Sequence, residues 1–220
     1  MKVFSFCLYG SRDKYCLGML ENLKLIQEHF PLWTTFVYYA SDVPSDILSR
    51  IQGFPRVFLK PTGVNGATNM IHRFFAIDED AVDTMVVRDA DSRIHSRDRW
   101  AINNWLESGK MAHIVRDHPY HGAYMMGGVW GIRKGLLPHT MTGLFESYRS
   151  HHKNAHGEDQ HFLARVIYPL IYRNALYHCC MKVGPQEVLT PIPFPILNGE
   201  FIGQVVEYPN SDGIPVPTME

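Results

Sequence analysis

The sequence predicts a single α/β domain in which a central, mostly parallel sheet is flanked by helices. Strand-like and helix-like segments alternate along the chain with short breaks, which is typical of βαβ units. A chain of 220 residues, of which 45% are hydrophobic, is long enough to bury one full core. In addition, the β-branched, apolar run that begins at Thr84 and stops at Asp89 is typical of a buried strand of an α/β sheet.

The first half of the chain begins with an expected strand at 2–9, which Gly10 and Ser11 close. Ser11 is placed to cap the helix that follows, whose apolar residues recur at helical spacing. A short helix at 44–52 has a proline near its first turn and a glycine after its end. The other elements expected in this half are strands at 33–40 and 56–59, a turn at 63–66 and a helical segment at 70–77.

The second half begins with the strand that ends at Asp89 and continues with a helix from Ser96 to about Glu107. Further strands are expected at 111–115, 126–132 and 176–183, and further helices at 138–151 and 158–172. From Gly184 onward, frequent prolines preclude long regular elements. We therefore expect one domain at 1–183, with the proline-rich segment 184–220 packed on it.

Composition and charge exclude several classes of protein. The formal net charge of −1 provides no basic field for nonspecific binding of nucleic acid, so no nucleic-acid partner is expected. No segment approaches the roughly 18 uninterrupted apolar residues of a membrane span, and residues 1–10 lack the features of a secretory signal. We expect a cytoplasmic protein without a membrane span. The four cysteines form no C-x-x-C pair, so free, largely buried thiols are expected.

Two aspartates separated by one residue, Asp89 and Asp91, follow the apolar strand. The open end of such a strand is where α/β folds hold ligands. Because Mg²⁺ and Mn²⁺ prefer carboxylate oxygens and keep positions free for phosphates, this pair suits a complex of metal and diphosphate. Paired acids in a loop are otherwise commonly solvated turn residues, and the spacing alone is a weak signal. The position at a strand end favours the metal site.

Three other groups bear on the same site. Arg73 lies on an apolar helical segment and could hold a phosphate or sugar hydroxyls, the alternative being a surface arginine that covers apolar side chains. Glu158 and Asp159 begin an expected helix, where capping alone would explain acidic residues. His178 could complete a metal shell, although a lone histidine in an apolar strand is usually a core residue. The histidine-rich stretch at 151–161 matches no compact set of zinc ligands.

Six short motifs occur in the order seen in small glycosyltransferases of the GT-A fold, and together they span nearly the whole chain. They are Arg73-Phe74, Arg88-Asp89-Ala90-Asp91-Ser92-Arg93, Arg116-Asp117-His118-Pro119, Gly127-Gly128-Val129-Trp130-Gly131, Asp159-Gln160 and Phe201-Ile202-Gly203-Gln204. The chain resembles the compact GT-A domains of large DNA viruses of algae, where such an enzyme helps to glycosylate the major capsid protein. It is more distantly similar to the retaining glycogenin and bacterial galactosyltransferase group. The resemblance implies a Rossmann-like GT-A domain that transfers a sugar from a UDP-sugar to a glycan or glycoprotein acceptor.

The resemblance also implies roles for individual residues. The ligands of a Mn²⁺ (or Mg²⁺) ion would be Asp89, Asp91 and His178, although relatives often have an acid after this histidine, where the present chain has Cys179. The residues that bind the donor would be Leu8, Tyr9, Gly10, Arg73, Asp89, Ala90, Asp91, Asp117, Gly127 and Gly128. The catalytic residues would be Asp159, Gln160 and Arg73.

The chemistry of these residues is consistent with sugar transfer. The leaving UDP gains negative charge, which a metal and the Arg73 guanidinium could stabilise together. Tyr9 could stack on the base, Asp117 could accept hydrogen bonds from sugar hydroxyls, and the glycine pair would let backbone approach the sugar. Because glutamine is a poor nucleophile, the Asp159-Gln160 pair is expected to orient the donor and stabilise an oxocarbenium-like state. This favours a retaining reaction without a covalent intermediate. An inverting route would instead need Asp159 or Glu158 as a general base.

Two other function classes remain open. A nucleotidyltransferase would also place paired carboxylates on a metal, but it would carry an early glycine-rich phosphate loop, for which Gly10-Ser11-Arg12 is a poor substitute. A non-catalytic module that binds nucleotide sugars would need no acceptor site. A phosphatase with a D-x-D nucleophile is disfavoured because that nucleophile normally ends the first strand, which here ends at Tyr9.

Overall fold

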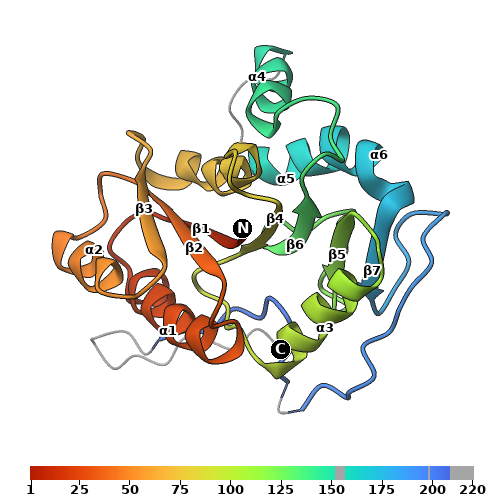
Figure 1. The fold of residues 1–220 in the computed structure, drawn as a ribbon, viewed down its shortest axis with the longest axis horizontal. Helices are drawn as coiled ribbons and strands as arrows, with labels where there is room; N and C mark the ends of the chain where they lie inside the picture. The colour runs from red at the N-terminus through yellow and green to blue at the C-terminus, as the bar shows by residue number, and fades with distance from the viewer. Residues whose placement is uncertain (152–156, 198, 209–220) are drawn as a thin grey trace.

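A computed structural model describes residues 1–151, 157–197 and 199–208, and within them seven strands form one sheet in the order β3-β2-β1-β4-β6-β5-β7 (Figure 1). The strands are β1 (Lys2–Leu8), β2 (Thr34–Tyr39), β3 (Val57–Pro61), β4 (Thr84–Arg88), β5 (Ala112–Arg116), β6 (Val129–Arg133) and β7 (Ala175–Cys179). Neighbouring strands are parallel except that β6 runs antiparallel to β4 and to β5. The expected α/β class with a mostly parallel sheet is confirmed.

Helices cover both faces of the sheet (Figure 1). One face carries α1 (Asp13–His29), α2 (Ser45–Gln52) and α3 (Ser96–Glu107). The other carries the 3₁₀ segment η1 (Gly66–Asp78), α4 (Met141–His151), α5 (Glu158–Phe162), the π-helical turn η2 (Leu163–Ile167), α6 (Tyr168–Ile171) and the 3₁₀ turn η3 (Tyr172–Asn174). Successive strand residues point to opposite faces, so Met85 packs in one core layer and Val86 in the other.

Some local details differ from the sequence-based expectations. The N-cap of α1 is Arg12 with no side-chain capping bond, so Ser11 does not cap the helix. The segment expected at 70–77 is longer and tighter, a 3₁₀ run from Gly66 to Asp78, because apolar spacing does not distinguish 3.0 from 3.6 residues per turn reliably. The helix expected at 158–172 contains a π-helical turn just before Pro169, which lacks the N–H that would continue the α-helical hydrogen bonds.

The antiparallel strand β6 determines what lies beside the end of β4. Because the two strands run in opposite directions, Val129 at the start of β6 pairs with Arg88 at the end of β4. The residues that follow β4 and those that precede β6 therefore meet at one edge of the sheet. This places Gly128 next to Asp89, about 40 residues earlier in the sequence.

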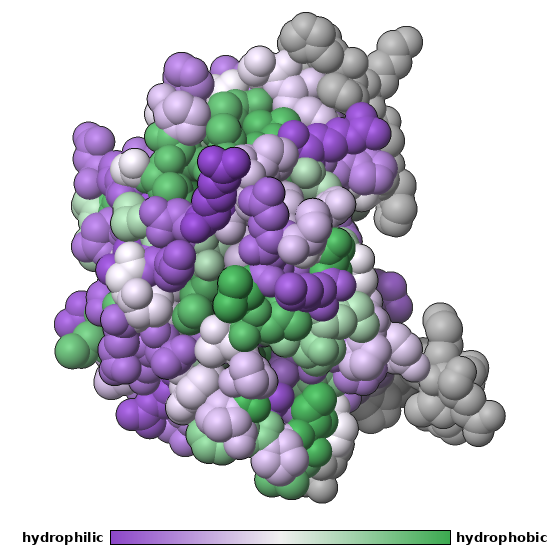
Figure 2. Space-filling view, turned by 90° about the vertical axis from the view of Figure 1, so that its right-hand side faces the viewer, coloured by the Kyte–Doolittle hydropathy of each residue, from purple (hydrophilic) through white to green (hydrophobic). Residues whose placement is uncertain are grey.

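The described part of the C-terminal segment lies against the domain. Glu187 is buried, binds the Arg116 guanidinium and accepts a hydrogen bond from the Tyr168 hydroxyl at 2.7 Å. Ile202 is fully buried. The face that carries β7 and this segment mixes polar groups with apolar patches (Figure 2). Exposed apolar side chains of the segment include Val188, Phe194 and Leu197. Residues 209–220 lie outside the described residues.

The cysteines are free, with Cys7, Cys16 and Cys179 buried and Cys180 exposed, as the spacing predicts. Within the described ranges, every helix is too short or too polar to cross a membrane.

Candidate active site

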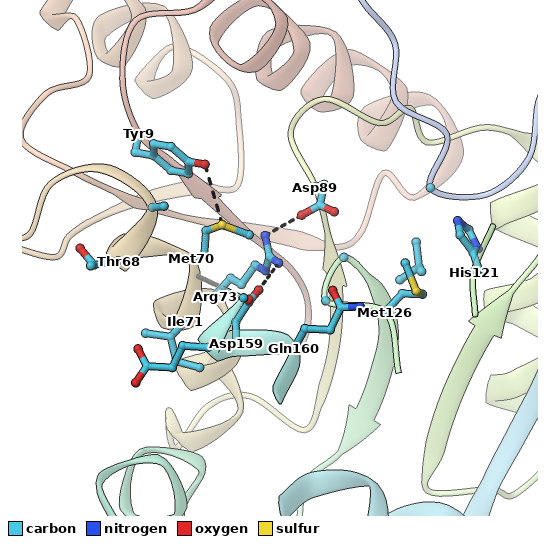
Figure 3. Close-up of a pocket in the computed structure, with 17 residues that line it drawn as sticks. Tyr9, Thr68, Met70, Ile71, Arg73, Asp89, His121, Met126, Asp159 and Gln160 are labelled. Atoms are coloured by element: carbon cyan, nitrogen blue, oxygen red, sulfur yellow. Dashed lines mark hydrogen bonds and ion pairs between the residues drawn. The ribbon is translucent and has the colours of Figure 1, made fainter. Parts of the chain in front are cut away.

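A cavity of about 490 Å³ opens at the carboxyl ends of β1 and β4. This volume is within the usual range for sites that hold small molecules and cofactors. The end of β1 contributes Tyr9, η1 contributes Thr68 and Met70, and the residues around β6 and α5 close the other sides. Figure 3 shows Tyr9 at one end of the cavity and His121 at the other, with Arg73 and Asp89 between them.

The centre of the cavity is an ion cluster formed by Arg73, Asp89 and Asp159 (Figure 3). Nη1 of Arg73 lies 2.5 Å from Oδ1 of Asp89, and its Nη2 lies 3.1 Å from Oδ2 of Asp159. The Arg73 side chain is only 3% exposed, whereas that of Asp89 is 40% exposed and faces the cavity. Burial opposes the charge of Arg73, but the two carboxylates outweigh it and raise the pKa of the guanidinium. The cation is therefore permanent.

Arg73 is positioned by η1, which is tied to the strands beneath it. The Ser5 hydroxyl of β1 donates to the Arg73 carbonyl at 2.6 Å. The Asn69 side-chain amide donates to the carbonyls of Leu8 and Tyr38, at 3.0 and 2.9 Å, and so joins η1 to β1 and β2. The buried Nε of Arg73 has no hydrogen-bond partner within the described ranges. The arginine is thus held rigidly and retains an unused donor.

The two glycines before β6 leave the room that this cluster occupies. A Cβ at Gly128 would lie 1.9 Å from Oδ2 of Asp89. A Cβ at Gly127 would lie 2.9 Å from Nη2 of Arg73 and 3.0 Å from Oδ2 of Asp159. Sequence reasoning placed these glycines in the site as an approach to the donor sugar, whereas their immediate neighbours are the charged side chains themselves.

Asp91 is not among the residues that line the cavity; it is 9% exposed, with its Oδ2 3.8 Å from Nζ of Lys14. Burial and the nearby charge of Asp89 raise the pKa of Asp91 to about 6. A hard cation bound between two such carboxylates would relieve their repulsion. Within the described ranges no group of three His, Cys, Asp or Glu side chains could hold a metal. Two carboxylates suffice for Mg²⁺ or Mn²⁺ when substrate phosphates complete the shell, so Asp89 and Asp91 fit that ion.

His178 does not join this site. It lies in β7, which β6 and β5 separate from β4, and its side chain points to the face covered by α3. Its Nδ1 lies 2.7 Å from Nε2 of His113, and its Nε2 lies 3.1 Å from Oδ1 of Asn104. Burial lowers the pKa of His178 to about 4, so the ring is neutral. The expectation of a third metal ligand at this position is corrected to a buried, hydrogen-bonded histidine of the core.

Other expected donor-binding residues lie beside the cavity rather than in its lining. Arg97 binds both oxygens of Asp117, at 2.5 and 2.6 Å, and the Ile202 amide donates to the same carboxylate. The Asp117 carboxylate therefore has little capacity left to accept hydrogen bonds from sugar hydroxyls. Leu8 and Ala90 pack in the core on the α1 side. The amide of Gly10, which has a φ of +67°, donates to Asp42 at 3.0 Å. Each of these residues shapes the loops without lining the cavity.

The predicted residues that do line the cavity are Tyr9, Arg73, Asp89, Gly127, Gly128, Asp159 and Gln160. The Tyr9 hydroxyl lies 3.8 Å from the Met70 sulfur, and the Tyr9 ring lines one end of the cavity. Sequence reasoning missed several lining residues, namely Thr68, Met70, Ile71, His121, Met126 and Gly203. Most are apolar or lie in loops, so spacing gave no signal, although His121 and Gly203 lie in or near motifs noted above. Of the histidine-rich stretch, residues 152–156 lie outside the described residues.

Searches with the sequence find no matching protein-family model and no matching curated protein. The structure is similar to galactosyltransferase LgtC bound to donor and acceptor sugar analogues (TM-score 0.54, 14% identity, 80% of this chain and 73% of that chain). It is similar to a glycosyltransferase involved in glycosylation of the PBCV-1 major capsid (TM-score 0.53, 13% identity, 81% of this chain and 81% of that chain). It is also similar to a Pyrobaculum calidifontis mannosyltransferase bound to GDP-Man and Mn²⁺ (TM-score 0.52, 12% identity, 83% of this chain and 55% of that chain). The chain has the GT-A fold, as expected.

Enzymes of another class share this architecture. A 4-diphosphocytidyl-2C-methyl-D-erythritol synthase from Anaerococcus prevotii matches with a TM-score of 0.51 at 12% identity, over 74% of this chain and 81% of that chain. At these identities the matches establish the fold, and the reaction has to be argued from the site.

Proposed function

We propose that this protein is a glycosyltransferase that uses a UDP-sugar donor and a divalent metal. The observation that carries the proposal is the buried Arg73 cation held between Asp89 and Asp159, inside a cavity at the carboxyl edge of a GT-A sheet. Sugar transfer from a nucleotide diphosphate needs fixed positive charge where the leaving phosphate forms. A rigidly held guanidinium that lines the cavity meets that need.

The proposed roles follow the length of the cavity. Tyr9 stacks on the uracil base at one end. Asp89 and Asp91 hold Mn²⁺ or Mg²⁺, which when bound supplies positive charge to the diphosphate. Arg73 donates to the phosphate that leaves with UDP, and its two carboxylate partners keep the guanidinium in place before the donor arrives.

Asp159 and Gln160 are proposed to act beneath the donor sugar, and the geometry favours a retaining reaction. Arg73 binds the Asp159 carboxylate, so this carboxylate is already held by a cation and is not free to approach an acceptor hydroxyl. Its charge is better suited to stabilising positive charge on the sugar ring. Glu158 also lines the cavity, and its buried Oε1 has no hydrogen-bond partner within the described ranges, so it is the candidate base for the inverting alternative.

The acceptor is proposed to be a hydroxyl of a glycan or glycoprotein, with a viral capsid protein as one candidate. This choice rests on the sequence resemblance and on the similarity to the PBCV-1 capsid enzyme.

The test is release of UDP from a panel of UDP-sugars, with GDP-sugars alongside, in the presence of Mn²⁺ and after EDTA treatment. Asp89→Asn and Asp91→Asn keep side-chain size and remove charge, and each should lower turnover by about 100-fold. Asp80→Asn, an exposed residue outside the cavity, is the matched control and should retain wild-type turnover. Activity that survives EDTA would reject the metal.

The same assay separates the other two classes. Exchange of pyrophosphate into CTP or UTP without sugar transfer would identify a nucleotidyltransferase, the class represented by the Anaerococcus prevotii enzyme. Tight binding of UDP-sugars with neither hydrolysis nor transfer would identify a binding module.

A further inference from the structure

We infer that the acceptor is a neutral pyranoside, held at the His121 end of the cavity by an acceptor surface composed of His118, Tyr120, His121 and Phe201. The inference rests on the proposed function, because it assigns the part of the cavity that the donor leaves empty. It adds the chemical class of the acceptor and the residues that select it.

The cavity has two unlike ends with the ion cluster between them (Figure 3). The Tyr9 end lies beside Thr68, Met70 and Ile71, at the strand end where we place the base. A donor that extends from Tyr9 to Asp89 and Asp159 fills this end and the centre. The opposite end, lined by His121, Met126 and Gly203, is then open to a second molecule.

Aromatic rings continue from His121, which lines this end, to His118, Tyr120 and Phe201, which lie outside the cavity lining and are linked to His121 by ring contacts. The rings of His118 and Phe201 are stacked, with centroids 4.1 Å apart and planes inclined by 18°. The Tyr120 ring lies 4.6 Å from His118, and the His121 ring lies 5.3 Å from Phe201. Tyr120 is 79% exposed, so much of its ring is available to a ligand. Aromatic faces carry partial negative charge and attract the polarised C–H groups on the flat face of a pyranose ring.

His121 supplies a polar group beside these rings. Its side chain is only 6% exposed, and its buried Nδ1 has no hydrogen-bond partner among residues 1–151, 157–197 and 199–208. Burial lowers the pKa of His121 to about 4, so the imidazole is neutral and has one donor and one acceptor. Gly203 lies beside the ring: an added Cβ there would be 3.5 Å from Cε1 and 3.7 Å from Nε2, so the missing side chain leaves space next to the imidazole. A neutral ring in this position can orient a sugar hydroxyl without demanding a charge.

The charges of the cavity select against an anionic acceptor. Glu158, Asp159 and Asp89 all line it, and Arg73 is already paired with two of these carboxylates. A uronate or a phosphorylated sugar at the His121 end would meet net negative charge. A neutral sugar ring meets no such repulsion, so the site favours uncharged glycosides.

The inference is tested with methyl glycosides of glucose, galactose, mannose, xylose and rhamnose, and with methyl glucuronide as the anionic comparison. Saturation-transfer NMR on the protein loaded with UDP and diamagnetic Mg²⁺ should show contact with at least one neutral glycoside and none with the glucuronide. In transfer assays, Tyr120→Ala and His121→Asn should each raise the KM for that glycoside by about tenfold, more than either alters UDP-sugar hydrolysis. Tyr120→Ala removes an exposed ring, so misfolding would not explain its effect.

Tyr124→Ala is the matched control, because it removes a partly exposed tyrosine of the same loop whose ring packs on Tyr168 and not on the rings of the acceptor surface. It should leave both KM and hydrolysis within about twofold of wild type. An unchanged KM in the Tyr120 and His121 variants, equal use of the glucuronide, or transfer to a serine peptide that is insensitive to Tyr120→Ala would overturn the inference. A wild-type protein that consumes no nucleotide sugar would instead reject the proposed function, and the NMR measurement would still decide whether the acceptor surface binds sugar.

Discussion

Replacing Gly128 with alanine tests whether catalysis needs Asp89 where the structure places it. The new Cβ would lie 1.9 Å from Oδ2 of Asp89 and 2.3 Å from its Cγ, and real Cβ atoms essentially never come within 3.0 Å of such neighbours. The Asp89 carboxylate therefore has to move by about 1 Å. Its Oδ1 is 2.5 Å from Nη1 of Arg73, so this movement breaks the ion pair at the centre of the cavity.

The structure indicates a large effect on activity and a small one on stability. A displacement of about 1 Å in an active-site group can lower turnover by about 100-fold, and that is the loss we expect for Gly128→Ala. The lost hydrogen bond between charged groups would be worth about 1.5–3 kcal/mol if fully buried. Because the Asp89 side chain is 40% exposed, solvent screening reduces the loss in unfolding free energy to about 1 kcal/mol.

Three measurements check this prediction: kcat for UDP-sugar hydrolysis, the Mn²⁺ dissociation constant from calorimetry, and the unfolding free energy from urea titration. Gly122→Ala is the matched control, because it lies in the same loop and its Cβ would meet no atom within 4 Å. The control should behave like wild type in all three. A Gly128→Ala protein with wild-type turnover and Mn²⁺ affinity would refute the role assigned to Asp89.

Three further predictions concern Asp159, Asp98 and His178. Asp159→Asn should lower kcat by about 100-fold and change the UDP dissociation constant by less than about threefold, since its charge acts on the transition state; equal losses in both would mark a binding or folding role. Asp98→Asn should lower the unfolding free energy, measured in urea, by about 3–5 kcal/mol, because it breaks a buried pair with Arg88 that has an Nη2 to Oδ1 distance of 2.6 Å; a loss below about 1 kcal/mol would contradict this. Burial lowers the pKa of His178 from its ordinary value of 6.5 to about 4 in the folded protein, so the unfolded chain takes up the proton first, and stability present above pH 6.5 should fall by up to about 3 kcal/mol as the pH drops toward 4. Urea titrations at several pH values should show that the unfolding free energy of His178→Phe falls less steeply with decreasing pH than that of wild type. An identical pH dependence in the two proteins would disprove the role assigned to His178 as a buried, neutral histidine.

Local sequence determined the elements and the polar ends of the strands. The β-branched, apolar run before Asp89 predicts a buried strand, and it forms β4 from Thr84 to Arg88. Alternation of strand and helix patterns sufficed for the α/β class, and the two aspartates after β4 were identifiable because loops at that edge carry ligands. These inferences succeed because hydrophobic period and turn chemistry act over a few residues.

The tertiary structure decided which of the candidate residues meet. Arg73 and Asp159 are 86 residues apart in the sequence and form an ion pair, because η1 and α5 contact each other and both side chains lie beside Gly127, just before β6. His178, which the resemblance implied as a third metal ligand, lies beyond β5 and faces Asn104 of α3. Strand order and the face to which each side chain points depend on long-range packing that no local pattern encodes. The chain therefore specified the chemistry available at the strand ends, and the order of β4, β6, β5 and β7 selected the groups that share the cavity.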